Sequence, residues 1–151
     1  MLGISVWQPW ASLIAAGAKR YETRSWQPPA SLIGQRLAIC SSRTAEGLHD
    51  TAQDDAFNRL CLRRLGQRQL PMGRVVAVVT VEGCIATTSR AARRIGVRER
   101  LVGDWSPGRY AWRLADVQTL AAPVPVTGSQ RFFYLPPRVL ARVLAQIGGE
   151  T

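Results

Sequence analysis

The sequence has few of the residues that metal sites and histidine-based enzymes use. It contains one histidine, His49, and three cysteines whose scattered positions lack the paired spacing of a zinc site. This chain therefore cannot supply a ribonuclease mechanism based on two histidines, and we expect neither a metal site nor a cofactor. An odd number of unpaired cysteines is more typical of buried free thiols than of a disulfide framework.

Long apolar runs are also missing. No stretch approaches the roughly 18 residues that a membrane span needs, and the first residues lack the basic and apolar regions of a signal peptide. With 46% hydrophobic and 20% charged residues, the composition is that of an ordinary globular domain. We therefore expect a single domain over residues 1–151, located in the cytoplasm and without a membrane partner.

Acidic residues are scarce relative to basic ones. Ten Asp and Glu accompany twenty Lys and Arg, which gives a net charge of +10 and a pI near 11.1. Such an excess attracts polyanions and favours a nucleic-acid partner. The alternative is a solubility charge in an arginine-rich proteome.

Lysine is the scarcest basic residue, because nineteen of the twenty are arginines and only Lys19 is a lysine. An arginine stays protonated near neutral pH, whereas a lysine can lose its proton when it is buried or crowded by other cations. Lys19 is therefore a candidate for proton transfer. The alternative is a chance lysine on the surface.

The pattern of apolar residues predicts an α+β fold. A helix should start near Pro9 and end at Gly17, and the β-branched run at residues 75–81 is typical of a strand buried on both faces. Strands and helices alternate without βαβ regularity, which favours a small mixed or closed β-barrel of five to six strands flanked by helices. The expected strands cover residues 4–7, 20–25, 36–41, 75–81, 109–114 and 124–126, and the longer helices cover residues 46–65 and 139–147.

Two N-terminal motifs carry a family resemblance. The chain has Gln8-Pro9-Trp10 at the expected helix start, followed by the pattern Gly-x-Lys-x-x-Glu-x-Arg at residues 17–24. Together they resemble the opening of the ASCH domain, named for activating signal cointegrator homology. The resemblance implies a PUA-like fold with a cleft between the first helix and the barrel. It also implies a role in RNA binding, coactivation, cleavage of single-stranded RNA or amide hydrolysis of acetylated cytidine.

Two departures from the family pattern bear on function. Many ASCH domains continue with Gly-x-Gln-Gly-Leu-Trp near the end, whereas residues 128–133 read Gly-Ser-Gln-Arg-Phe-Phe, so Arg131 replaces a glycine. The acetylcytidine hydrolases of the family have a threonine three residues after the motif lysine, and here that residue is Glu22. A hydroxyl nucleophile is therefore missing from its expected place.

The motif defines a candidate site. Glu22 and Arg24 share a strand face at spacing two, so the guanidinium can hold a phosphate or carbonyl while Lys19 and Glu22 exchange protons; a surface ion-pair ladder is the alternative. Glu82 either points into the cleft or marks the strand's exit to solvent. The candidate catalytic residues are Lys19, Glu22, Glu82 and Tyr110, and the candidate nucleic-acid-binding residues are Arg20, Arg24, Arg109, Trp10, Ser129 and Arg131.

The leading functional hypothesis is a protein that binds single-stranded RNA, or a nucleotide-like ligand, and cleaves the bound strand without a metal. One alternative is an amidohydrolase of a modified nucleoside such as acetylated cytidine. Another is a nucleic-acid-binding adaptor without catalysis. The net charge favours the first and third hypotheses, because a nucleoside hydrolase has no need of it.

Overall fold

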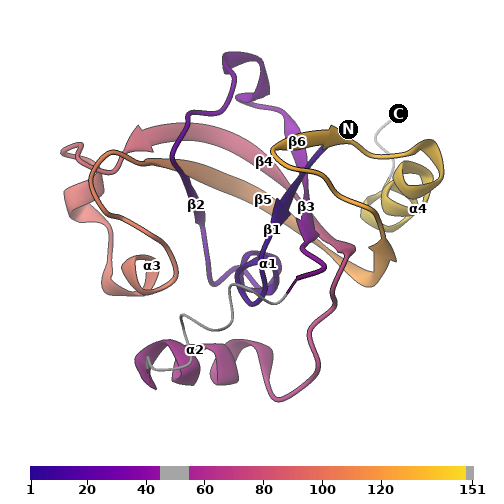
Figure 1. Ribbon diagram of the computed structural model, residues 1–151, viewed down its shortest axis with the longest axis horizontal. Helices are drawn as coiled ribbons and strands as arrows, with labels where there is room; N and C mark the ends of the chain where they lie inside the picture. The colour runs from indigo at the N-terminus through magenta and orange to yellow at the C-terminus, as the bar shows by residue number, and fades with distance from the viewer. Residues whose placement is uncertain (45–54, 149–151) are drawn as a thin grey trace.

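A computed structural model describes residues 1–44 and 55–148 of the chain. Its helices surround a curved sheet, with α1 and α2 below the sheet and α4 at one side in the view of Figure 1. The strands are β1 (Leu2–Val6), β2 (Tyr21–Arg24), β3 (Arg36–Ser41), β4 (Arg74–Ala86), β5 (Tyr110–Pro125) and β6 (Phe132–Tyr134). The helices are α1 (Trp10–Ala15), α2 (Asp55–Leu65), α3 (Val97–Leu101) and α4 (Pro137–Ile147), with short 3-10 turns η1 (Ala30–Leu32) and η3 (Ala92–Arg94).

The sheet is mixed and has six strands in the order β2-β5-β4-β3-β1-β6. β1 and β3 run parallel, and the other neighbours pair antiparallel. This confirms the predicted α+β PUA-like fold. Within the described part of the chain no backbone pairing joins the edge strands β2 and β6, so the sheet is curved but not closed.

Aromatic side chains bring the two edges together where backbone pairing does not. The Trp26 ring, just after β2, lies 5.2 Å from the Phe132 ring on β6 and 4.9 Å from the Trp112 ring on β5, in edge-on geometry in both cases. Such contacts contribute beyond the area they bury. Packing of these side chains therefore holds the end of β2 close to β6.

The core lies where the sequence predicts it. Val75 to Val79 and Val81 in β4 are all buried, which confirms a strand covered on both faces. The face of β5 that carries Trp112 and Leu114 packs inside the curve of the sheet, with Tyr110 partly buried against it. A second apolar cluster, centred on Val143, packs α4 against the opposite face of the sheet.

The helix α1 ends as predicted and delivers the chain into the core. Gly17 has φ of +74°, and the N–H groups of Ala18 and Lys19 both donate to the carbonyl of Leu13. At the other end, the Gln8 amide accepts from the Ser12 N–H and donates to the Ser12 hydroxyl and the Pro71 carbonyl. Gln8 therefore has a structural role, because it joins the start of α1 to the segment that precedes β4.

Three expectations have a different outcome. The strands expected at residues 109–114 and 124–126 are the two ends of one strand, β5, because the residues between them also pair with β4. The short strand β6 was not predicted, because three residues are too few for a period-2 pattern. The helix expected at residues 46–65 is present as α2 from Asp55, while its first half lies outside the described residues.

In the described ranges no helix has the length and apolarity needed to cross a membrane.

Candidate functional site

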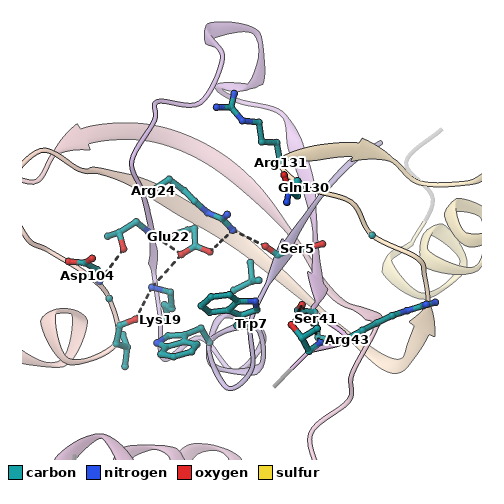
Figure 2. Close-up of a pocket in the computed structure, with 18 of the residues that line it drawn as sticks. Ser5, Trp7, Lys19, Glu22, Arg24, Ser41, Arg43, Asp104, Gln130 and Arg131 are labelled. Carbon is teal, nitrogen blue, oxygen red and sulfur yellow. Dashed lines mark hydrogen bonds and ion pairs between the residues drawn. The ribbon is translucent and has the colours of Figure 1, made fainter. Parts of the chain in front are cut away.

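A cavity of about 1020 Å³ opens beside β2, facing the edge formed by β1 and β6. Figure 2 shows residues of β1, β2 and the adjoining loops converging on it. Seven of the ten predicted site residues line this cavity, although they come from four separate parts of the chain. They are Trp10, Lys19, Glu22, Arg24, Arg109, Ser129 and Arg131.

The motif residues form a continuous row across the cavity wall (Figure 2). The Glu22 carboxylate lies between two cations, 3.9 Å from the Lys19 Nζ and 3.3 Å from an Arg24 guanidinium nitrogen. It also accepts a hydrogen bond of 3.1 Å from the Thr23 N–H. Arg24 then donates to the Ser5 carbonyl at 2.8 Å, so the row reaches from β2 to β1. The predicted shared face of Glu22 and Arg24 is thus observed.

Lys19 occupies the closed end of this row. Its side chain is only 2% exposed, and its Nζ donates a 2.8 Å hydrogen bond to the Val102 carbonyl. Gly103 lets the loop lie close over it, because a Cβ at that position would lie only 3.0 Å from the Trp105 Nε1 and would touch the Lys19 Nζ at 3.4 Å. Burial lowers the pKa of Lys19, against the opposing effect of the Glu22 and Glu99 carboxylates. The alternative of a chance surface lysine is therefore wrong.

A second ion pair forms the wall behind β2. Arg109 lies with its Nε 3.4 Å from an Asp104 oxygen and donates through a terminal nitrogen to the Thr23 carbonyl at 3.0 Å. The Asp104 N–H in turn donates to the Thr23 hydroxyl. A hydrogen bond from Ser106, together with Arg109, lowers the pKa of Asp104. These contacts fix the loop that covers Lys19 and commit much of Arg109 to structure.

The rest of the cavity lining includes an exposed aromatic side chain and two further cationic ones. Trp7, immediately after β1, lines the cavity and is 47% exposed, which is high for a large apolar residue. Arg43 extends from the end of β3 and donates to the Thr127 hydroxyl at 2.9 Å. Arg131 lies at the upper end in Figure 2. The cavity lining thus includes an exposed indole and several guanidinium groups, residue types that stack on nucleic-acid bases and contact phosphates.

Three predicted residues lie elsewhere. Glu82 pairs with Arg113 at 2.9 Å, and both side chains are at least half exposed, outside the cavity. Tyr110 stands opposite Arg24 in the β2–β5 ladder but packs against the core. Arg20 is exposed, and its N–H donates to Glu99. Their proposed roles in the site gain no support from this geometry.

Trp10 belongs to both the cavity and the core. Its ring lies 5.8 Å from that of Phe57 on α2, and it packs against two apolar clusters while lining the cavity. One face of this tryptophan therefore has a structural function. Trp7 is the more accessible ring of the two.

Sequence reasoning missed Ser5, Arg43 and Asp104, which the fold brings into the cavity. None of them belongs to a recognisable motif, and each lies at or near the end of a strand or in a loop. Their only common signal is polarity next to an apolar segment, which is too general to be useful. His49 lies outside the described residues. Among residues 1–44 and 55–148, no group of three or more His, Cys, Asp or Glu is placed to hold a metal ion.

The described lining of the cavity is strongly cationic. Five of its side chains are basic, namely Lys19, Arg24, Arg43, Arg109 and Arg131, and two are acidic, Glu22 and Asp104. Its volume is at the upper end of the roughly 300–1,000 Å³ that small-molecule sites occupy. The cavity can therefore accommodate an anionic ligand at least as large as a nucleotide.

The fold is that of a PUA-like domain, and its cavity has a mainly cationic lining. The sequence profile of the ASCH domain matches residues 4–124. The chain therefore belongs to the ASCH domain family. None of the curated protein sequences matches it significantly.

Solved structures agree with this assignment. The ASCH protein from Zymomonas mobilis is 19% identical, with a TM-score of 0.58 over 95% of this chain and 93% of that chain. A single-residue variant of that protein is 18% identical, with a TM-score of 0.58 over 95% of this chain and 96% of that chain. At these identities the likeness shows a shared fold.

Proposed function

We propose that this ASCH domain binds single-stranded RNA in the cavity beside β2. The observation that carries the proposal is the cationic lining combined with the exposed Trp7 ring. Guanidinium groups contact phosphates, and an aromatic face stacks on an unpaired base. Arg24 is suited to the first contact, since it is partly exposed and held in place by Glu22 and the Ser5 carbonyl.

Cleavage of the bound strand is a second candidate function. A buried lysine next to a carboxylate favours it, because burial disfavours the charged form of Lys19 and its Nζ lies 3.9 Å from the Glu22 carboxylate. Glu22 would take the proton of a ribose 2′-hydroxyl, whose oxygen attacks the adjacent phosphorus. Glu22 would then pass this proton to the leaving 5′-oxygen, which leaves a 2′,3′-cyclic phosphate, and the buried Lys19 beside it would control the protonation of Glu22. Arg24 would then stabilise the charge that develops on the phosphate.

The two alternatives have less support. An amidohydrolase with a second carboxylate at Glu82 does not fit the geometry, because Glu82 pairs with Arg113 outside the cavity. A non-catalytic adaptor fits the cationic lining equally well, but it gives no reason for the single lysine to be buried beside Glu22.

Binding to a labelled single-stranded RNA octamer at several salt concentrations tests the main proposal. The logarithm of the affinity should fall linearly with the logarithm of the salt concentration, because arginine–phosphate contacts release counterions. A flat salt response, or equal affinity for an uncharged nucleoside, contradicts the proposal.

Product analysis with the same RNA tests cleavage. A strand with 2′-deoxyribose throughout should bind and stay intact, since it lacks the attacking hydroxyl. Lys19→Arg should keep most of the binding and lose turnover, because arginine stays protonated. Full turnover in this variant, once its folding is verified by circular dichroism, excludes Lys19 as a proton-transfer group.

A further inference from the structure

Arg131 has a backbone conformation that arginine rarely adopts. Its φ is +60°, in the left-handed region, where a Cβ crowds the neighbouring carbonyl. Glycine adopts this conformation without strain, so the path of the chain alone gives no reason for an arginine here. Strained residues of this kind concentrate at sites where the side chain serves a function.

The side chain of Arg131 is held without using its hydrogen-bonding groups. Its guanidinium carbon lies 5.0 Å from the centroid of the Trp26 ring. Trp26 is itself fixed by edge-on contacts with Trp112 and Phe132. Within the described residues, the Arg131 guanidinium has no hydrogen bond or ion pair. The contact with Trp26 thus holds the guanidinium over the ring and, among the described residues, leaves its N–H groups free for a bidentate contact with a phosphate.

The position of Arg131 indicates which phosphate it can reach. The residue lines the cavity, yet Figure 2 shows its guanidinium at the upper rim, directed away from the row of Lys19, Glu22 and Arg24. A mononucleotide bound at that row has its phosphate near Arg24. A second phosphate at the rim requires a strand that continues out of the cavity.

We propose that Arg131, stacked on Trp26, holds a backbone phosphate of a single strand of nucleic acid where the strand leaves the cavity. This inference rests on the proposed function and deepens it. The preferred ligand is then an oligonucleotide, and a free nucleoside or mononucleotide occupies only part of the site.

Three variants test this contact. Arg131→Gly removes the side chain and the backbone strain, and Arg131→Asn removes the charge with a residue that tolerates positive φ. Arg138→Ala, on the exposed surface of α4, removes the same charge away from the cavity and serves as the matched control. Affinities are measured for a single-stranded RNA octamer by fluorescence anisotropy and for uridine monophosphate by calorimetry, with a melting curve for each variant.

We expect both Arg131 variants to bind the octamer about tenfold more weakly, the loss typical of one charge-assisted contact. Their affinity for uridine monophosphate should not change, their melting temperatures should stay within about 3 °C of the unmodified protein, and Arg138→Ala should have little effect. Unchanged octamer binding in both Arg131 variants overturns the inference, as does an equal loss for both ligands or a large fall in melting temperature. If the inference is overturned in any of these ways but Arg24→Gln still weakens octamer binding, the proposed function is retained. If the unmodified protein binds no RNA, the proposed function fails and the inference fails with it.

Discussion

The two ends of the cavity differ in how their charged groups are used. At the inner end, Lys19 is buried under the loop at Val102 and Gly103, and its ammonium group is committed to a carbonyl and to Glu22. At the outer end, Arg131 stacks on Trp26 and keeps its N–H groups available. Desolvation dominates the first environment and solvent screening the second.

This difference separates the expected effects of substitution. A change at the inner end should alter the stability of the fold and the protonation of the site. A change at the outer end should alter affinity with little effect on stability. Arg24 lies between them, because it contacts both Glu22 and the Ser5 carbonyl while remaining one-quarter exposed.

The largest expected effect is on stability, at the inner end. Lys19→Ala should lower the free energy of unfolding by about 3 kcal/mol, because it leaves a cavity, an unpaired Val102 carbonyl and a Glu22 carboxylate with one partner fewer. Urea denaturation measures this change. Arg131→Gly, measured in parallel, should change the same quantity by less than about 1 kcal/mol. Similar losses of unfolding free energy in Lys19→Ala and Arg131→Gly would contradict the distinction between a structural inner end and an accessible outer end.

Arg24→Gln should weaken binding of single-stranded RNA about tenfold to a hundredfold, through loss of a charged contact to phosphate. Arg113→Gln is a well-matched control, because Arg113 forms a comparable Arg–Glu pair on β5 outside the cavity. Fluorescence anisotropy titrations at one fixed salt concentration compare the RNA affinities of the two variants. An equal loss in Arg113→Gln would mean that net charge, and not the cavity, determines affinity.

Trp7→Ala should reduce RNA affinity by about tenfold, near the low end of the range for loss of one base-stacking contact. The free energy of unfolding should fall by less than about 1 kcal/mol, because the ring is already half exposed. Trp7→Phe keeps an aromatic face and should restore most of the affinity. If Trp7→Ala binds RNA as well as the unmodified protein, the exposed ring is not a stacking surface.

The smallest expected effect is a pH dependence at the inner end. Burial lowers the pKa of Lys19 in the folded protein below the ordinary value of 10.5 that it has in the unfolded chain. At a pH between the folded-state pKa and the unfolded-state pKa, the unfolded chain therefore binds more protons than the folded protein. The free energy of unfolding should therefore rise with pH across that window, and Lys19→Met should remove this contribution. Because the chain has a single lysine, labelling lysine with ¹³C gives one Cε signal to titrate by NMR. Titration at or above 10.5 contradicts the burial argument.

Local sequence patterns were enough to predict much of the fold. The β-branched run of β4, the apolar stripe of α4 and the end of α1 at Gly17 all depend on local patterns, and all three are where these patterns predict them. The shared strand face of Glu22 and Arg24 was equally predictable, because residues two apart on a strand point to the same side of the sheet. Of the seven predicted site residues that line the cavity, Lys19, Glu22 and Arg24 come from the one motif at residues 17–24.

Which charged groups are buried and which remain accessible depends on the packing of distant segments. Nothing in the local sequence distinguishes Glu82, paired with Arg113 near the surface, from Glu22, enclosed between Lys19 and Arg24. Arg43 and Asp104 likewise reach the cavity through contacts with residues more than 80 positions away. The environment of a charge depends on every segment packed around it, and these segments meet only when β2 and β6 approach each other across the curved sheet.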